Sequence, residues 1–222
     1  MRMSKKKRKA KKKLQMRNKR LVKKYYWLLP RNAWTGEIDD DYDYTYVVWD
    51  LDRGWHKAFG QMYLDELGEA IKESKQTDFM IQQMKEKYGQ LRVYTGPTTS
   101  KVHQIIRKYE YISENICIYC GREAPMVDDS WIMPICLNCY KNNYRRREKY
   151  FGKGYIPKTD EEITEQYRAL VHEEPGEDGK WHMTTSYTIR SYDKDGFKDV
   201  VYDITDTVEK IRKRQSKWIR KD

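Results

Sequence analysis

The spacing of apolar residues predicts a small mixed unit in the first half of the chain. From Trp55 to Lys72 apolar side chains recur at helical spacing. Residues 79–94 alternate as expected for a β-hairpin with its turn near Tyr88 and Gly89. A second amphipathic helix follows Pro97, and its predicted buried stripe is Val102, Ile105, Ile106, Tyr109 and Ile112. Together these segments predict an α-β-β-α unit.

The same patterning predicts further elements on both sides of this unit. Tyr44, Tyr46 and Val48 alternate as in a strand. Thr159 and Glu162 have the spacing of a capping box that starts a helix running to about Val171. Segments 181–190 and 197–204 predict a second hairpin around the turn sequence DKDG, and a basic helix closes the chain.

Charge is divided unevenly along the 222 residues, whose formal net charge is +11. Residues 1–36 carry 15 Lys and Arg and no acid, whereas residues 37–207 carry 23 basic and 32 acidic residues. With 19 Tyr and 7 Trp, most of the chain is rich enough in aromatic residues to fold. We therefore expect an acidic body with a basic N-terminal arm and a basic last helix.

The arm is low in complexity and its like charges repel, so we expect residues 1–24 to be disordered unless a partner orders them. Its lysines suit contacts with a phosphate backbone, which carry no sequence preference. The alternatives are a solvated tail and, in KKKRK, a nuclear-import signal. The candidate nucleic-acid contacts are Lys5, Lys6, Lys7, Arg8, Lys9, Lys11, Lys12, Lys13, Arg17, Lys19, Arg20, Arg145, Arg146 and Arg147.

An acidic strip, residues 37–52, follows the arm with seven acids and no base. It lacks the ligand spacing of a calcium-binding loop. We expect it to attract either the basic arm or a cationic partner.

All four cysteines lie in one segment as C-x2-C-x15-C-x2-C, at Cys117, Cys120, Cys136 and Cys139. Two close pairs, with a short hairpin between them, favour one tetrahedral Zn²⁺ over disulfides; an iron–sulfur cluster or a redox dithiol is the alternative. Four thiolates would fill the coordination shell, so we expect a structural zinc ribbon-like module over residues 115–142 and no catalytic residues.

Two resemblances bear on this module. CIYCG and CLNCYKNN resemble the zinc-framing halves of HNH endonucleases, but those enzymes need histidines, and residues 121–135 contain none. KEKYGQLRVY (85–94), followed by a helix and ICIYCG, resembles a loosely defined group of bacterial and phage proteins. This second likeness implies a phage or mobile-element gene and a place in the cytoplasm of a bacterial host; it implies no activity.

The predicted fold class is α+β, with the α-β-β-α unit, the inserted four-cysteine zinc module and a C-terminal helix-hairpin-helix extension. The expected domains are the arm (1–24), an α+β domain (25–150) and the extension (151–222). No apolar run is long enough for a membrane span. We expect a non-enzymatic protein that binds nucleic acid or a nucleoprotein complex. The alternatives are an inhibitor that binds a host protein through the acidic strip, and an HNH-like nuclease.

Overall fold

The computed structural model describes residues 4–219, apart from residues 33, 39–40, 153 and 194–195. The chain forms two compact units. Unit 1 comprises Met1–Leu51, Met62–Lys85 and Arg92–Ile106; unit 2 comprises Asp52–Gln61, Glu86–Leu91 and Arg107–Asp222. Helices alternate with two-stranded sheets, so the predicted α+β class is confirmed.

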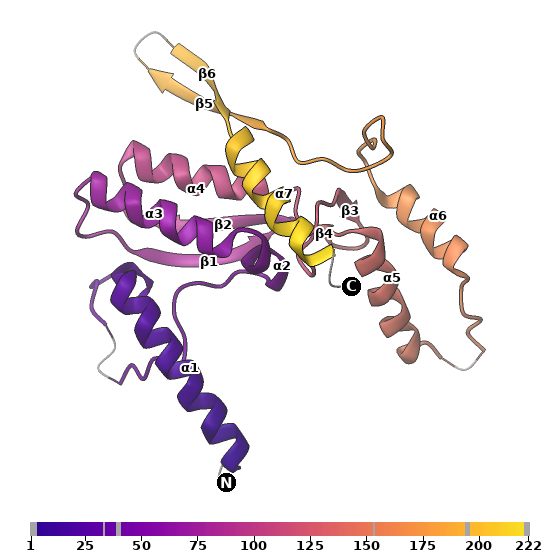
Figure 1. Ribbon diagram of the computed structural model, residues 1–222, viewed down its shortest axis with the longest axis horizontal. Helices are drawn as coiled ribbons and strands as arrows, with labels where there is room; N and C mark the ends of the chain where they lie inside the picture. The colour runs from indigo at the N-terminus through magenta and orange to yellow at the C-terminus, as the bar shows by residue number, and fades with distance from the viewer. Residues whose placement is uncertain (1–3, 33, 39–40, 153, 194–195, 220–222) are drawn as a thin grey trace. The chain divides into compact units, whose positions relative to one another are not determined.

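The predicted helix–hairpin–helix succession is present (Figure 1). It consists of α2 (Arg53–Trp55), a π-helical turn (His56–Gly60), α3 (Gln61–Glu73), β1 (Ile81–Lys87), β2 (Gln90–Thr95) and α4 (Ser100–Ser113). The hairpin turns at Tyr88 and Gly89. Four of the five residues predicted to form the buried stripe of α4 are buried, whereas Ile105 is only half-buried; the four are Val102, Ile106, Tyr109 and Ile112. The π-helical turn was not predicted, because its residues keep the apolar spacing of an ordinary helix.

Unit 1 has an aromatic core. Trp27, in the short 3₁₀ helix Tyr26–Leu28, is almost completely buried. Its ring lies 6.2 Å from that of Trp49 and 5.9 Å from that of Phe79, and Trp49 lies 5.1 Å from Tyr63 of α3. These edge-on and tilted contacts join the start of the folded chain to the helix and the hairpin.

The expectation that residues 1–24 are disordered on their own was wrong for most of the arm. Residues Lys5–Lys24 form helix α1, capped by the Ser4 hydroxyl. Lys, Arg and Ala are good helix formers, and the last turn carries Lys23 and Lys24 where a helix dipole favours cations. Burial of Asn18 and Val22 fixes the C-terminal half. Helix propensity and the packing of the C-terminal half therefore outweigh the repulsion between neighbouring lysine and arginine side chains.

The strand predicted around Tyr44 was also wrong. The chain there is irregular, and Tyr44 has a φ of 61°, which no strand residue adopts. Asp43 accepts hydrogen bonds from both the Thr45 amide and hydroxyl, at 3.0 and 2.6 Å. The Thr45 amide and hydroxyl therefore find their hydrogen-bond acceptor within a local turn and not in a neighbouring strand.

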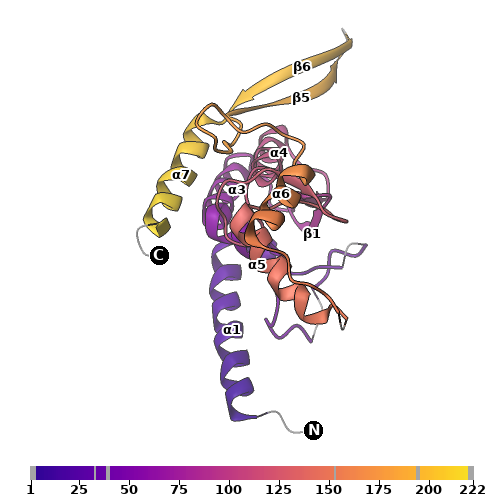
Figure 2. The ribbon, with the colours of Figure 1, turned by 90° about the vertical axis from the view of Figure 1, so that its right-hand side faces the viewer.

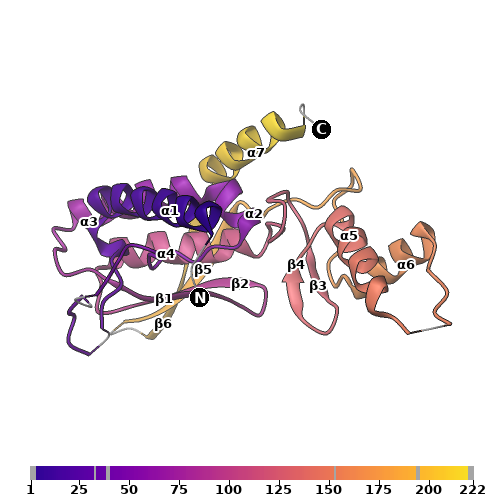
Figure 3. The same cartoon turned by 90° about the horizontal axis from the view of Figure 1, so that it is seen from below.

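Unit 2 contains the remaining elements. They are β3 (Met126–Asp128), β4 (Ile132–Pro134), α5 (Leu137–Arg147), a 3₁₀ turn (Glu148–Tyr150), α6 (Asp160–Leu170), β5 (Ser186–Asp193), β6 (Gly196–Asp203) and α7 (Thr205–Ile219). Figure 3 shows the short hairpin β3–β4 followed by α5 and α6, which lie against each other. Figure 2 shows β5 and β6 as a long hairpin leading into α7. The predicted capping box of α6, the second hairpin and the last helix are confirmed, although β5 begins at Ser186 and not at residue 181. The DKDG turn falls partly outside the described residues.

Candidate metal centre and nucleic-acid interface

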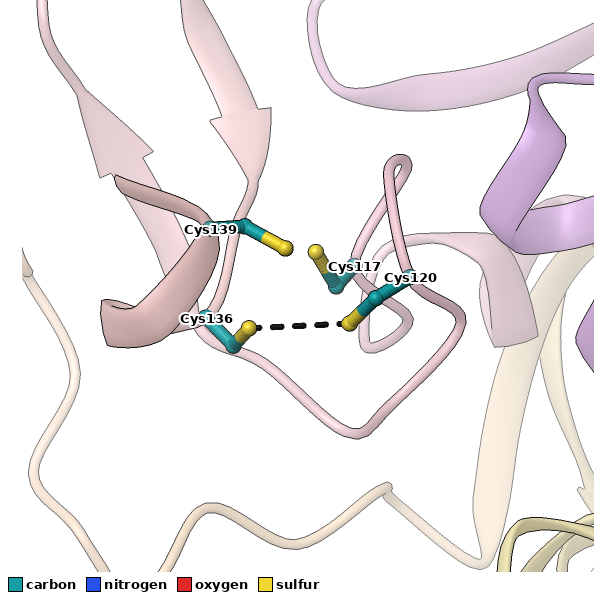
Figure 4. A group of neighbouring side chains, drawn as sticks. All are labelled: Cys117, Cys120, Cys136 and Cys139. Atoms are coloured by element: carbon teal, nitrogen blue, oxygen red, sulfur yellow. Dashed lines mark hydrogen bonds between the residues drawn. The ribbon is translucent and has the colours of Figure 1, made fainter. Parts of the chain in front are cut away.

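The four cysteine sulfurs converge on one point. All four Sγ atoms lie within 4.8 Å of one another, and the Sγ atoms of Cys120 and Cys136 are 3.6 Å apart. Figure 4 shows the first pair on one loop, facing the second pair across the site. A tetrahedral ion with metal–sulfur bonds of about 2.3 Å would need sulfur–sulfur edges of about 3.8 Å. The cluster could therefore hold a metal ion with little rearrangement.

The first pair is shaped by α2. Gly54 donates its amide to the Ile118 carbonyl at 2.7 Å, and the buried Trp55 donates its indole Nε1–H to the Ile116 carbonyl at 2.9 Å. A Cβ at Gly54 would lie 2.0 Å from the Cys117 carbonyl oxygen, and one at Gly121 would lie 2.6 Å from the Gly54 carbonyl. Only glycine at both positions lets the two backbones approach this closely.

The second pair is shaped by α5. Cys136 is the N-cap residue of this helix and Cys139 lies in its first turn. The positive end of a helix dipole favours thiolates at both positions. Backbone hydrogen bonds from Ile118 to Pro134, at 3.0 Å, and from Ile135 to Pro125, at 3.2 Å, then join the two cysteine loops.

Helices α6 and α7 brace the loops from other parts of unit 2. Tyr167 of α6 donates its hydroxyl to the Ile135 carbonyl at 2.9 Å. Gln215 of α7 donates its amide to the Gly121 carbonyl at 2.8 Å, and the Arg212 Nε–H donates to the Glu123 carboxylate at 2.7 Å. The cysteine module is therefore part of a larger unit and not an isolated knuckle.

The electrostatics of the thiol cluster favour a cation. Hydrogen bonds from Cys120, and then from Cys136 and Cys139, lower the pKa of the Cys117 thiol. The hydrogen bond to Cys117 raises the pKa of the Cys139 thiol, because a second thiolate beside the first is repelled. A bound cation would offset that repulsion and allow all four sulfurs to ionise.

Among the described residues, the potential metal ligands that lie close together are these four cysteines, and no histidine or carboxylate joins them. Because four protein sulfurs complete a tetrahedral shell, an ion bound by all four would have no open coordination position.

The arm's candidate nucleic-acid contacts lie along α1. All eleven candidates between Lys5 and Arg20 are exposed. Some also contact the acidic strip: Lys11 pairs with Asp43 at 2.9 Å, and the Lys19 ammonium lies 5.0 Å from the Tyr44 ring centroid. The expected attraction between the strip and the arm is thus present within unit 1, and most of the basic face of α1 is left toward solvent.

The three arginines at the end of α5 differ in their surroundings. Arg145 is bound to Glu148, to Asp160 and to the Lys158 carbonyl. Arg147 pairs with Asp129 at 2.8 Å. Arg146 is exposed and has no ion pair in the described part of the chain. Of the three, Arg146 is the one whose charge is not already matched.

Five residues that support the cysteine loops through contacts between distant parts of the sequence were not identified from the sequence, namely Gly54, Trp55, Glu123, Arg212 and Gln215. The one local signal was the Gly-Trp pair at the start of an amphipathic helix. The others lie on an ordinary charged helix or in a loop, and their partners are distant in the sequence.

No model of a known protein family, no curated protein and no solved structure matches this chain. Among the described residues, no helix combines the length and apolar character that crossing a membrane requires.

Proposed function

We propose that this protein is a non-enzymatic, zinc-stabilised factor that binds nucleic acid, alone or in a nucleoprotein complex, through α1. The observation that carries the proposal is the form of the arm. It is a helix of 20 residues with 13 Lys and Arg and no acid, capped at its start and packed at its end.

An ordered basic helix is a better polyanion ligand than a flexible tail of the same charge, since less conformational entropy is lost on binding. At 1.5 Å per residue, α1 is about 30 Å long. Asn18 donates its side-chain amide to the Tyr44 carbonyl at 2.9 Å, and Lys24 pairs with Asp65 at 2.8 Å. Both contacts lie in the C-terminal half. In the first half Lys11 pairs with Asp43 at 2.9 Å, and the Lys and Arg residues around it are exposed.

Zinc is the ion we assign to the cysteine cluster. Four thiolates in a tetrahedron suit Zn²⁺ best among common cellular ions, and the four sulfurs leave no place for a reactive water. The ion would stabilise the loops around the buried Cys117 and perform no turnover.

The salt dependence of binding tests the proposal. Affinity of the metal-loaded protein for duplex DNA and RNA, measured by fluorescence anisotropy, should fall steeply as salt rises. The slope of log affinity against log salt concentration should become shallower by up to about three or four when four exposed residues of α1 are changed to Gln, namely Lys6, Lys9, Lys13 and Arg17. Gln keeps the helix and removes the charges. The same slope should change less when a matched set on α7 is changed to Gln, namely Lys210, Lys213, Arg214 and Lys217. Affinity that is insensitive to salt, or unaffected by the α1 changes, contradicts the proposal.

A second candidate is an inhibitor that binds a host protein through the acidic strip and nearby aromatic residues. Trp34, whose side chain is 95% exposed, and the exposed Tyr46 favour it, because exposed aromatic residues are typical of protein interfaces. Affinity purification from a nuclease-treated bacterial lysate separates the two candidates. A partner protein that survives nuclease favours the inhibitor; one that is lost favours nucleic-acid binding.

The nuclease alternative draws on the β3–β4–α5 arrangement beside the cysteines. Asp129 in this arrangement is already paired with Arg147, and no histidine occurs in residues 121–135. Purified protein incubated with plasmid and Mg²⁺ decides the matter: we expect the plasmid to stay intact.

A further inference from the structure

A pocket lies on the cysteine module, between the hairpin β3–β4 and helix α5. Its volume is about 290 Å³, and all of its lining residues belong to unit 2. This is near the lower end of the range for small-molecule sites, which suits one flat ring system better than a peptide segment. The pocket has no part in metal binding.

The walls of the pocket carry two partly exposed aromatic rings. Trp131 precedes β4 and is 51% exposed, while Tyr119, between the first two cysteines, is 41% exposed. The floor is apolar and buried, with Val127, Ile135 and Tyr140. Aromatic rings of this kind offer stacking surfaces at low entropic cost.

The indole of Trp131 is held in place despite its exposure. Its Nε1–H donates to the Glu86 carboxylate at 3.2 Å, and the other Glu86 oxygen accepts from the Gly89 amide at 2.6 Å. The Gly89 amide therefore holds the Glu86 carboxylate in place, and this carboxylate orients the Trp131 ring. A partly exposed tryptophan that is oriented by a hydrogen bond is prepared for contact with a ligand.

The rim of the pocket is polar and basic. Arg146 and Asn143 of α5 line it together with the Arg147–Asp129 pair. Because Arg147 is already neutralised, Arg146 supplies the net positive charge at this rim. Asn143 and Asp129 add hydrogen-bonding groups of the kind that read the edge of a base.

We propose that this pocket binds one unpaired base of a single-stranded nucleic acid, stacked on Trp131 and Tyr119, with the adjacent phosphate at Arg146. The inference rests on the proposed function and extends it: α1 supplies affinity for any polyanion, and the pocket adds a preference for unpaired strands. In a duplex the faces of the bases are stacked on each other, so the pocket cannot reach them.

The test compares a short oligodeoxynucleotide without self-complementarity with its duplex, using metal-loaded full-length protein at one salt concentration. The single strand should bind more tightly and should quench part of the tryptophan fluorescence. Trp131→Ala should weaken single-strand binding by about fivefold to a hundredfold, the usual range for loss of one stacked base, and leave duplex binding unchanged. Trp131→Phe should restore most of the loss.

Matched controls come from the chain itself. Trp34→Ala removes another exposed tryptophan and should leave the single-strand preference intact. Lys149→Ala should cost less single-strand affinity than Arg146→Ala. Metal content and circular dichroism confirm that each variant is folded. If the protein binds both forms equally, and Trp131→Ala behaves as Trp34→Ala does, the pocket inference is overturned and the proposed function stands. If it binds neither form at low salt, both fail.

Discussion

At the scale of single residues, the cysteine cluster gives the sharpest expectations, because each sulfur offers one of four potential ligand atoms. Replacing Cys136 by Ala should abolish tight metal binding, whereas Cys136→His should retain one ion, since imidazole can take the vacant position. Metal stoichiometry by mass spectrometry and the visible spectrum of the Co²⁺-loaded protein measure both effects.

The Ala variant should also lose near-UV circular dichroism, since Tyr140 and Tyr167 pack against the cysteines. Full occupancy by metal in Cys136→Ala would show that the ion does not need all four sulfurs, and would reopen the question of a coordination position for water.

Gly54 makes a second prediction at this scale. A methyl group there would lie within 2.0 Å of the Cys117 carbonyl oxygen, which is backbone and cannot move aside cheaply. Gly54→Ala should lower the free energy of unfolding by about 2 kcal/mol or more. Gly152→Ala is the control, because no atom lies within 4 Å of its added Cβ, and its effect should stay below about 1 kcal/mol. Urea denaturation measures both, and equal effects would contradict the role given to Gly54.

Asp43 links the acidic strip to the arm. Hydrogen bonds from Thr45, and then from Lys11, lower the pKa of its carboxyl group to about 2. Because the folded pKa lies below the unfolded one, the stabilisation is present above about pH 4 and is lost as the pH falls toward 2.

NMR titration of the Asp43 carboxyl tests that assignment. Thr45→Val removes the hydroxyl donor and should raise the pKa of Asp43 more than Lys11→Ala does, because the Thr45 bonds are the larger cause. A larger rise in Lys11→Ala would mean that the ion pair to α1 dominates.

At the scale of elements, the predictions from sequence succeeded where a short-range rule decides the structure. The hairpin at Tyr88 and Gly89, the stripe of α4 and the capping box of α6 depend on neighbours a few residues apart. They failed for α1 because tertiary contacts with Asp43 and Tyr44 hold this helix. They failed around Tyr44 because a local turn between Asp43 and Thr45 competes with the strand that the alternation predicts. Charge repulsion within a segment does not reveal a partner elsewhere in the chain.

The capping box allows a test of how α6 supports the cysteine module. Thr159 accepts from the Glu162 amide at 3.2 Å, and the Glu162 carboxylate accepts from the Thr159 amide at 2.6 Å. Thr159→Ala should destabilise the protein by about 1 kcal/mol, and Thr159→Ser should be nearly neutral because the hydroxyl acceptor is kept. Thermal unfolding of the metal-loaded variants measures the difference; equal melting temperatures for Ala and Ser would show that the cap is dispensable.

At the scale of the whole molecule, the two units carry different parts of the proposed function. The cysteines and the pocket lie in unit 2, while α1 and the contacts to Asp43, Tyr44 and Asp65 lie in unit 1. The spacing of the cysteines was sufficient to predict that the four sulfurs converge, because metal chemistry fixes both residue type and spacing. The pocket could not be predicted, since it depends on the packing of Tyr119, Trp131 and Arg146 from three separate segments.

This division predicts that metal removal separates two kinds of binding. Treatment of the full-length protein with a chelator should unfold the cysteine module and abolish the preference for single strands, because the pocket is built on β3, β4 and α5. The steep salt dependence should persist, because α1 is anchored within unit 1 and its charges do not depend on the metal. Anisotropy titrations at several salt concentrations, before and after chelation and after zinc is restored, measure both properties. If chelation abolishes all binding, α1 does not act independently of the metal module, and the assignment of general affinity to the arm and selectivity to the pocket has to be abandoned.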